Sequence, residues 1–502
     1  MSCFPVDFFI YVYIYVYMMK KVTCENKMIK GSESALEQKR RNGKRRFYIM
    51  SKRRAAFLTL GCKVNQYETD AMEEILEKNG YDIVSFKETA DVYIINTCSV
   101  TNMADRKSRQ MIHRAKKNNP DAVIVAAGCY VQAAEKEMAE KNMADILVGN
   151  NKKKDIAQIL EEYFAVKAVK EEEQQVPLVS EVIDINHTKE YEDLTIHKVN
   201  EHTRAYIKIQ DGCNQFCSYC IIPYTRGRIR SKNPEEVIEE VKNLAAQGYK
   251  EIVLTGIHLS SYGKDLGDIT LLDVIQRIQQ IEDVERIRLG SLEPRIITEQ
   301  FVKELRACDK VCPHFHLSLQ SGCDETLKRM NRKYTTEEYE TALNILRTYY
   351  EHPALTTDVI AGFVGETEEE FEKTRAYLEK INLYEMHIFK YSVREGTRAQ
   401  KMSGHVPEQV KTERSDVLLA MAKRHKSEFE KWYVGRKEKV LLEEIIEKNG
   451  KKYFQGYTAH YVKVAVELSE NDTKLRQNEV IVVDIQGFID ENLLYGKVSI
   501  EF

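Results

Sequence analysis

Three cysteines in one short loop constrain this 502-residue chain more than any other feature. They are Cys213, Cys217 and Cys220, in the run Asp211–Pro223 that directly follows a strand-like segment, Ala205–Ile209. A structural zinc site usually takes four ligands, so three thiolates leave it one ligand short. Cysteine thiolates also hold iron–sulfur clusters, and a four-iron cluster on three thiolates keeps one iron open to a small molecule. The spacing therefore predicts an open cluster in preference to zinc or to three buried apolar cysteines.

The composition excludes several classes of protein. Charged residues make up 30% and hydrophobic residues 43% of the chain, as in ordinary globular proteins, and the length predicts roughly two to four domains. The formal net charge of −3 provides no global basic field for nucleic acid. The 11 cysteines are an odd number spread over a long chain, which argues against a disulfide framework. We expect metal or catalytic use of them in a reducing compartment, the cytoplasm.

The amino terminus has an unusual composition. Phe4–Met19 is apolar apart from one aspartate, but this run is short for a membrane span, and two lysines follow it, whereas a signal peptide carries its basic residues first. A basic stretch with nine Lys or Arg, Lys39–Arg54, comes next. A membrane anchor and an RNA-contacting tail are the alternatives. We expect instead a disordered or non-native extension over residues 1–52, with Met50 as a candidate start.

Residues 53–165 predict a doubly wound parallel sheet, because short apolar strands alternate with helical patterns. Asp70 and Glu73 resemble a capping box at the start of the first helix, which we expect to end at Gly80. The expected strands are Ala56–Leu60, Val92–Ile95, Ala122–Ala126 and Asp145–Val148.

A cysteine follows each of the first three expected strands, namely Cys62, Cys98 and Cys129. The carboxyl ends of parallel strands share one edge of the sheet, where ligands bind, so we expect these thiolates to converge on a second three-thiolate site. The alternative is three unrelated buried cysteines. Asn65, Asn96 and Gln132 lie on the same loops and are candidate hydrogen-bonding partners of that site, although such residues more often serve turns or caps.

Residues 166–200 are charged and irregular, and we expect a linker with some extended pairing there. The pattern of residues 201–431 predicts a partial (β/α)6 barrel of the TIM type, whose active site forms at the carboxyl ends of its strands. The cysteine loop follows the first of these strands and falls at that end. The six expected strands are Ala205–Ile209, Ile252–Gly256, Arg286–Leu289, Phe315–Leu319, Thr357–Ile360 and His387–Tyr391.

Glycines and polar residues in the loops after these strands suit the binding of a small molecule. The candidate ligand contacts are Tyr219, Gly256, Glu293, Ser318, Gln320, Gly362 and Glu366. We expect the remaining cysteines of this region, Cys308, Cys312 and Cys323, to be core residues. The basic run Arg226–Lys232 has two interpretations: it satisfies nearby carboxylates and carbonyls, or it contacts phosphates or a flipped base.

Residues 432–502 predict a small antiparallel β-barrel. Gly435–Phe502 holds ten Lys or Arg and twelve Asp or Glu, so any RNA contact there must be local and based on shape. The expected strands are Val440–Glu443, Tyr453–Tyr457, Tyr461–Val466 and Val480–Ile485.

Two three-cysteine sites, a partial barrel and a C-terminal β-module together resemble the methylthiotransferase family of radical S-adenosylmethionine enzymes, over residues 54–502. The resemblance implies a catalytic radical cluster, a [4Fe-4S] cluster on Cys213, Cys217 and Cys220. It implies an auxiliary [4Fe-4S] cluster on Cys62, Cys98 and Cys129, and a TRAM domain at the C-terminus. The chain departs from the family in having a TRAM segment that is not basic, and Phe363-Val364 where a proline is common.

The run Leu60–Glu68, Leu-Gly-Cys-Lys-Val-Asn-Gln-Tyr-Glu, is similar to the branch that acts on N6-threonylcarbamoyladenosine in tRNA. This resemblance implies methylthiolation of C2 of that base at position 37, with two molecules of S-adenosylmethionine per turnover. It implies three partners, namely the tRNA anticodon loop, a low-potential electron donor and a sulfide source, and no membrane. The alternatives are isopentenyladenosine in tRNA, an aspartate of a ribosomal protein, or a non-catalytic iron–sulfur protein for RNA binding or electron transfer.

Overall fold

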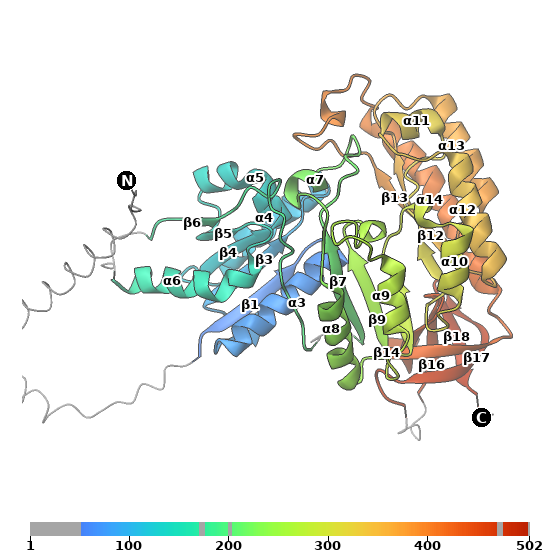
Figure 1. The fold of residues 1–502 in the computed structure, drawn as a ribbon, viewed down its shortest axis with the longest axis horizontal. Helices are drawn as coiled ribbons and strands as arrows, with labels where there is room; N and C mark the ends of the chain where they lie inside the picture. The colour runs from blue at the N-terminus through green and yellow to red at the C-terminus, as the bar shows by residue number, and fades with distance from the viewer. Residues whose placement is uncertain (1–51, 170–175, 199–202, 469–474, 500–502) are drawn as a thin grey trace, which may run out of the picture. The chain divides into compact units, whose positions relative to one another are not determined.

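The computed structural model describes residues 52–169, 176–198, 203–468 and 475–499 (Figure 1). The expected amino-terminal extension and its candidate start at Met50 lie outside these residues. From Arg53 on, the described residues belong to one compact unit. Among the described helices, none combines the length and the hydropathy that a membrane crossing requires.

The first part of the chain is a six-stranded sheet in the order β2-β1-β3-β4-β5-β6, with every neighbouring pair parallel. Helices α3 and α6 pack on one face and α4 and α5 on the other, so the sheet is doubly wound as predicted. The strands are β1 (Arg54–Thr59), β2 (Asp82–Val84), β3 (Val92–Thr97), β4 (Val123–Gly128), β5 (Ile146–Val148) and β6 (Val179–Glu181). The helices are α3 (Lys63–Lys78), α4 (Asn102–Asn118), α5 (Cys129–Glu140) and α6 (Ile156–Val169), with a 3-10 turn, η2 (Lys153–Asp155).

Three details of this domain differ from the prediction. The predicted capping box at Asp70 is wrong, because α3 already begins at Lys63 with Cys62 in the capping position, and Asp70 lies in mid-helix. The prediction also missed the edge strand β2, and it gave no bounds for the extended pairing expected in the linker; β2 and β6 are each three residues long and too short to show a pattern. Strand β6 lies within the stretch predicted as a linker.

The central part has six parallel strands that follow one another in chain order, in two sheets: β10-β9-β7-β8 and β11-β12-β13. Parallel bridges Ile287–Val311 and Leu292–Leu317 connect the two sheets. The strands are β7 (Arg204–Asp211), β9 (Glu251–Gly256), β10 (Arg286–Leu289), β11 (His314–His316), β12 (Ala354–Ala361) and β13 (Glu385–Lys390), with a short antiparallel strand, β8 (Arg230–Ser231), at the edge. The six predicted strands are therefore all present, although the predicted ends differ by up to three residues.

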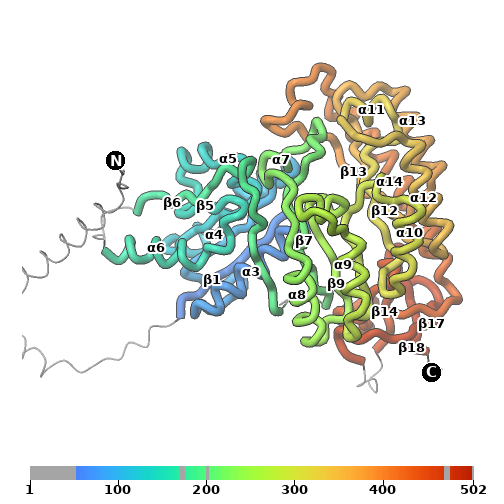
Figure 2. Tube along the Cα trace, in the orientation of Figure 1, coloured from blue at the N-terminus to red at the C-terminus, as the bar shows by residue number. Residues whose placement is uncertain are grey.

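Helices cover one face of these strands (Figure 2). The largest apolar core among the described residues lies between these helices and the strands. The helices are α8 (Pro234–Ala246), α9 (Leu271–Ile278), α10 (Glu299–Arg306), α12 (Thr336–Tyr349), α13 (Glu368–Ile381) and α14 (Glu408–Lys431). Shorter helices are α7 (Ile222–Thr225) and α11 (Asp324–Arg329), and the 3-10 turns are η3 (Leu259–Ser261), η4 (Pro294–Ile296) and η5 (Ala399–Lys401).

The opposite face of the central strands, here called the inner face, is polar. Because successive side chains of a strand point to opposite faces, Ala205, Ile207 and Ile209 of β7 enter the apolar core, and the residues between them point to the inner face. The same alternation puts ionisable residues of other strands on this face. Examples are Arg204, Lys208, Glu251, Arg288, His316 and Asp358.

The C-terminal part is a closed five-stranded barrel in the order β14-β15-β16-β18-β17. The prediction of four antiparallel strands was incomplete, because a fifth strand exists and the pair β16–β18 is parallel. Gly496 lies inside β18, where a Cβ would lie 2.2 Å from Val483, so close packing requires the glycine. The strands are β14 (Lys437–Lys448), β15 (Lys451–Thr458), β16 (Lys463–Glu467), β17 (Val480–Asp490) and β18 (Leu493–Val498).

Candidate functional site

The cysteines Cys62, Cys98 and Cys129 lie at the carboxyl edge of the first sheet, one after each of β1, β3 and β4. A Cβ at Gly61 would lie 2.7 Å from the Cys98 sulfur, so the loop that carries Cys62 approaches Cys98 closely. Burial, with smaller contributions from Cys129 and Cys62, raises the pKa of the Cys98 thiol to about 12. A metal that binds Cys98 would have to displace its proton.

The second cysteine loop leaves β7 through Gly212, whose φ is +71°. A Cβ at Gly212 would lie 1.8 Å from the backbone oxygen of Arg228, so no other residue fits there. Burial and the neighbouring Cys217 raise the pKa of Cys213 to about 11 and that of Cys220 to about 12. These three thiols therefore also lie together, in a loop at the carboxyl end of β7.

The spacing of both sets of cysteines argues against a single metal ion. Among the described residues, one group offers three possible ligand atoms within 4.8 Å of one another, and it consists of His316, Asp358 and His387 on the inner face. The sulfurs of neither cysteine set meet that distance. Thiolates that bind separate irons of a cluster have no need to meet it, so the donor sets fit a cluster better than zinc.

A segment that the sequence analysis missed, Arg329–Tyr334, holds the second cysteine loop. The Ser218 amide donates to the Met330 oxygen at 2.9 Å, and Asn331 Nδ2 donates to the Phe216 oxygen at 2.9 Å. Half-buried Arg332 donates from Nη1 to the Cys217 sulfur at 3.4 Å and from Nη2 to the Ser318 oxygen at 3.2 Å. The run Met-Asn-Arg-Lys-Tyr was visible in the sequence, but nothing local linked it to cysteines more than one hundred residues away.

The predicted ligand contacts lie at the same end of the strands as this cysteine loop. Gly256 ends β9, Glu293 caps η4 after β10, Ser318 and Gln320 follow β11, and Gly362 follows β12. Glu293 accepts a hydrogen bond from Gln215 of the cysteine loop at 3.0 Å. Tyr219 packs edge-on against Phe363, with 6.2 Å between ring centroids.

Glu366 differs from the other candidates because protein groups already use its carboxylate. Its Oε1 accepts from the Gly362 amide at 2.9 Å and from Arg414 at 2.8 Å, and the side chain is buried. Gly362 itself has a φ of +70°. Glu366 therefore fixes the shape of the glycine loop after β12.

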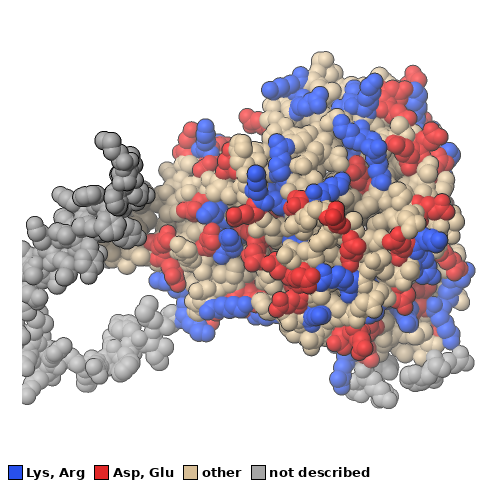
Figure 3. Space-filling model, in the orientation of Figure 1, with Lys and Arg blue, Asp and Glu red and all other residues tan. Residues whose placement is uncertain are grey.

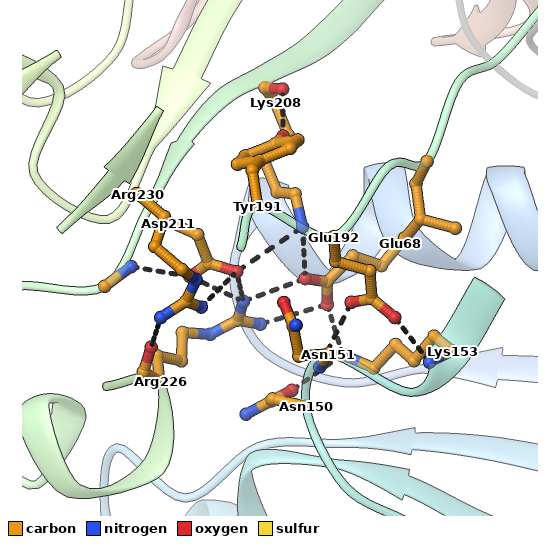
Figure 4. A network of polar contacts seen from close by, with 12 residues as sticks. Glu68, Asn150, Asn151, Lys153, Tyr191, Glu192, Lys208, Asp211, Arg226 and Arg230 are labelled. Carbon is orange, nitrogen blue, oxygen red and sulfur yellow. Dashed lines mark hydrogen bonds and ion pairs between the residues drawn. The ribbon is translucent and has the colours of Figure 1, made fainter. Parts of the chain in front are cut away.

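A buried ionic network, drawn in Figure 4, joins the helix that begins after Cys62 to the segment that follows Cys220. Arg226 donates from Nη1 to Glu68 Oε1 at 2.8 Å and from Nη2 to Glu68 Oε2 at 3.0 Å, and both side chains are fully buried. Asp211 accepts from Arg226 at 3.2 Å, and Lys208 donates to Glu68 at 3.0 Å. Lys153 donates to Glu68 as well. Burial alone would raise the pKa of Glu68, but Arg226, Lys153 and Lys208 outweigh it and hold that pKa well below its usual range.

For most residues of the basic run Arg226–Lys232, this network favours the first interpretation, in which they satisfy carboxylates and carbonyls of the protein. Arg226, Arg230 and Lys232 are buried and satisfy protein carboxylates and carbonyls. Arg228 alone is exposed, with its guanidinium 4.5 Å from the centroid of the Phe216 ring, and stays available for a ligand.

The amides expected around the first cysteine site have mainly structural partners. Asn65 donates to two backbone oxygens, Asn96 to the Asn65 oxygen and Gln132 to the Ile183 oxygen. Asn150, which the sequence analysis did not select, contacts the Cys129 sulfur at 3.5 Å. As predicted, the three remaining cysteines of the central part are buried, namely Cys308, Cys312 and Cys323.

Comparisons with known families agree with this architecture. Residues 54–149 match the uncharacterized protein family UPF0004, and residues 207–378 match the Radical SAM superfamily. A solved structure of the radical S-adenosylmethionine methyltransferase TsrM from Kitasatospora setae shares the fold, with a TM-score of 0.51 at 14% identity over 67% of this chain and 73% of that one. The fold and the cysteine loop therefore define a radical S-adenosylmethionine enzyme.

Relatives with a higher sequence identity show to which family within this class the chain belongs. The chain is 42% identical to the threonylcarbamoyladenosine tRNA methylthiotransferase MtaB of Bacillus subtilis, over 83% of this chain and 91% of the relative. The protein of the same name from Thermotoga maritima is 38% identical over 81% and 89% of the two chains. A tRNA-2-methylthio-N(6)-dimethylallyladenosine synthase of Clostridium botulinum is 36% identical over 77% and 85%. The chain belongs to the tRNA methylthiotransferase family.

Proposed function

We propose that this enzyme adds a methylthio group to C2 of N6-threonylcarbamoyladenosine at position 37 of tRNA. The observation that carries the proposal is the buried Glu68–Arg226 ion pair, which joins the helix that begins after Cys62 to the segment that follows Cys220. The identity of 42% to a relative named for this substrate supports the choice of base. The relative named for dimethylallyladenosine, at 36% identity, makes that base the second candidate.

The domains follow from this function. Residues 53–165 would form the methylthiotransferase domain, 166–200 the connection, 201–431 the partial barrel of the radical core, and 432–502 the TRAM domain. The auxiliary cluster would bind Cys62, Cys98 and Cys129, and the radical cluster Cys213, Cys217 and Cys220. When bound, these clusters and two equivalents of S-adenosylmethionine supply the sulfur, the methyl group and the one-electron chemistry.

The chain itself positions and encloses these groups. Arg332 and Gln215 fix the second cysteine loop against the ends of β10 and β11. Glu366 shapes the loop at Gly362, where the backbone would approach the nucleoside part of S-adenosylmethionine. The other proposed contacts of this cofactor are Tyr219, Gly256, Glu293, Ser318 and Gln320.

The partners of the reaction would be the tRNA anticodon loop, a low-potential electron donor and a sulfide source in the cytoplasm. Lys and Arg are interspersed with Asp and Glu on the face shown in Figure 3, where they form no broad basic field. Recognition of the tRNA would therefore depend on local contacts to a single-stranded loop, in which a base is readily turned out.

Three cysteine variants test the assignment in reconstituted enzyme. Cys217→Ala should lose both reductive cleavage of S-adenosylmethionine and methylthiolation, because it removes a ligand of the radical cluster. Cys98→Ala should retain cleavage and lose methylthiolation, whereas the buried core variant Cys308→Ala should retain both. Mass spectrometry of the tRNA nucleosides reports the product. Methylthiolation of the dimethylallyl base alone would refute the proposed substrate.

A further inference from the structure

Cations gather on the inner face at the amino-terminal ends of the central strands, far from the cysteine loop. Arg204 begins β7, Arg286 begins β10, and Arg288 lies two residues further on. Lys63 extends to them from the first turn of α3, with its Nζ 5.7 Å from the centroid of the Tyr206 ring. We call Lys63, Arg204, Arg286 and Arg288 the cationic floor.

The cationic floor has more positive than negative charge. Arg204 pairs with Glu443 at 2.8 Å, while Arg286 and Arg288 share Glu251, at 3.5 and 2.6 Å. Within the described ranges, Lys63 forms no ion pair with a carboxylate. Four cations therefore face two carboxylates, and the unmatched side chain is Lys63, which is exposed to solvent.

A second unmatched group lies beside the floor. His314, at the start of β11, is buried, and its Nδ1 has no hydrogen-bond partner among the described residues. Its ring lies 5.2 Å from the Tyr461 ring, and Arg288 lies 4.7 Å from the same ring. Unpaired polar atoms in buried positions are uncommon in folded proteins, so this imidazole indicates a polar ligand, and the positive charge of Lys63 acts on the same imidazole.

The cofactor is a poor candidate for that ligand. Its proposed contacts lie at the carboxyl ends of the strands, whereas the floor lies at their amino ends. Tyr206 and Asp211 are five positions apart on β7, which corresponds to about 17 Å at the rise of a strand. A group that binds Lys63 must therefore extend from the reacting base towards the amino ends of the strands.

We infer that Lys63 binds the carboxylate of the threonylcarbamoyl substituent, with His314 Nδ1 as a partner for its hydroxyl. This inference rests on the proposed function. Lys63 directly follows Cys62, and neighbouring Cα atoms are 3.8 Å apart. One base can therefore place its C2 at the auxiliary site and its N6 substituent at Lys63. In adenine, C2 and the carbon that bears N6 both flank N1, so the substituent lies on the edge that reacts. A dimethylallyl group has no charge for Lys63 to bind.

The test pairs a change in the protein with a change in the substrate. Anticodon stem–loop RNAs would carry at position 37 the threonylcarbamoyl base, its carboxylate methyl ester or plain adenosine. Their dissociation constants would be measured with reconstituted wild type, Lys63→Met, Lys63→Arg and a control, Lys303→Met, on the outer helix α10. Iron and sulfide contents would show that the variants hold equal amounts of cluster.

We expect Lys63→Met to lose at least about tenfold in affinity for the acid, the loss typical of a charge-assisted hydrogen bond. Wild type should bind the methyl ester more weakly than the acid by a similar factor. Lys63→Met should bind the methyl ester and the acid with equal affinity. Lys63→Arg should recover most of the affinity, and Lys303→Met should behave as wild type.

Two results would overturn the inference, and one of them leaves the proposed function standing. If wild type binds acid and methyl ester equally while it still methylthiolates the threonylcarbamoyl base, the carboxylate site is refuted and the function stands. This comparison needs no variant, so it decides even if Lys63→Met fails to hold its clusters. If wild type binds the threonylcarbamoyl base no better than plain adenosine and does not methylthiolate it, the proposed function fails and the inference fails with it.

Discussion

Arg226 donates two hydrogen bonds to Glu68, at 2.8 and 3.0 Å, and both side chains are fully buried. Glu68 lies six residues after Cys62, and Arg226 lies six residues after Cys220. The ion pair, drawn in Figure 4, thus connects the helix that begins at one cysteine site with the segment that follows the loop carrying the other. It holds two sites at a fixed separation although they belong to different sheets.

Glu68→Gln should destabilise the protein by about 3–5 kcal/mol, because it leaves Arg226, Lys153 and Lys208 buried with too few carboxylates. Urea unfolding at neutral pH would measure the loss. The control variant Glu161→Gln, at an exposed position of α6, should unfold as wild type does. The double variant Glu68→Gln with Arg226→Met should lose less than the sum of the two single changes. Additive losses would show that the pair does not act as a unit.

Arg332→Met should lower the reduction potential of the radical cluster by about 60 mV or more. Arg332 donates to the Cys217 sulfur at 3.4 Å, and a cation there favours the more negative, reduced cluster. About 60 mV corresponds to a tenfold change in a one-electron equilibrium. A redox titration followed by electron paramagnetic resonance would measure it, with Arg306→Met on the outer helix α10 as the control. An unchanged potential would limit Arg332 to holding the loop.

The positions of the six cysteines in the fold were predictable because they depend on local spacing and on one rule of topology. Cys213 and Cys220 share a loop, and Cys62 and Cys98 follow neighbouring parallel strands, so the sheet places them without any knowledge of side-chain packing. The apolar periodicity likewise predicted the strand–helix alternation of the first two domains.

What the sequence could not predict depends on contacts between distant segments. The role of Arg226 was undecided because Glu68 is 158 residues away and nothing local shows that it is buried. The hydrogen bond from Arg332 to the Cys217 sulfur was missed for the same reason. Strand β18 was missed, and its Gly496 packs so closely against Val483 that the position requires a residue without a side chain, which only the folded barrel shows.

Glu430→Gln should stabilise the protein at pH 8 but not at pH 4. Burial raises the pKa of Glu430 to about 7, and Lys426 only partly offsets this. The folded state therefore binds a proton that the unfolded state has released, so stability falls as the pH rises from about 4.5 to 7. Glutamine retains the acceptor for Tyr384, 3.3 Å away, and carries no charge. The expected gain at pH 8 is about 2 kcal/mol.

Thermal unfolding of wild type and Glu430→Gln across this pH range would measure the difference. Glu428→Gln, an exposed position on the same helix, should follow wild type at every pH. Parallel curves for wild type and Glu430→Gln would mean that Glu430 titrates as an ordinary surface carboxylate.

Arg228→Ala should weaken binding of the tRNA and reduce its dependence on salt. Arg228 is the exposed member of the basic run Arg226–Lys232, and it stacks on Phe216 inside the second cysteine loop. If it binds one phosphate of the anticodon loop, the slope of log affinity against log salt should fall by about one unit. Affinities measured at several salt concentrations give this slope. The matched control is Arg306→Ala on the outer helix α10, which should leave it unchanged. An equal loss of affinity at every salt concentration would instead favour stacking of Arg228 on a base over contact with a phosphate.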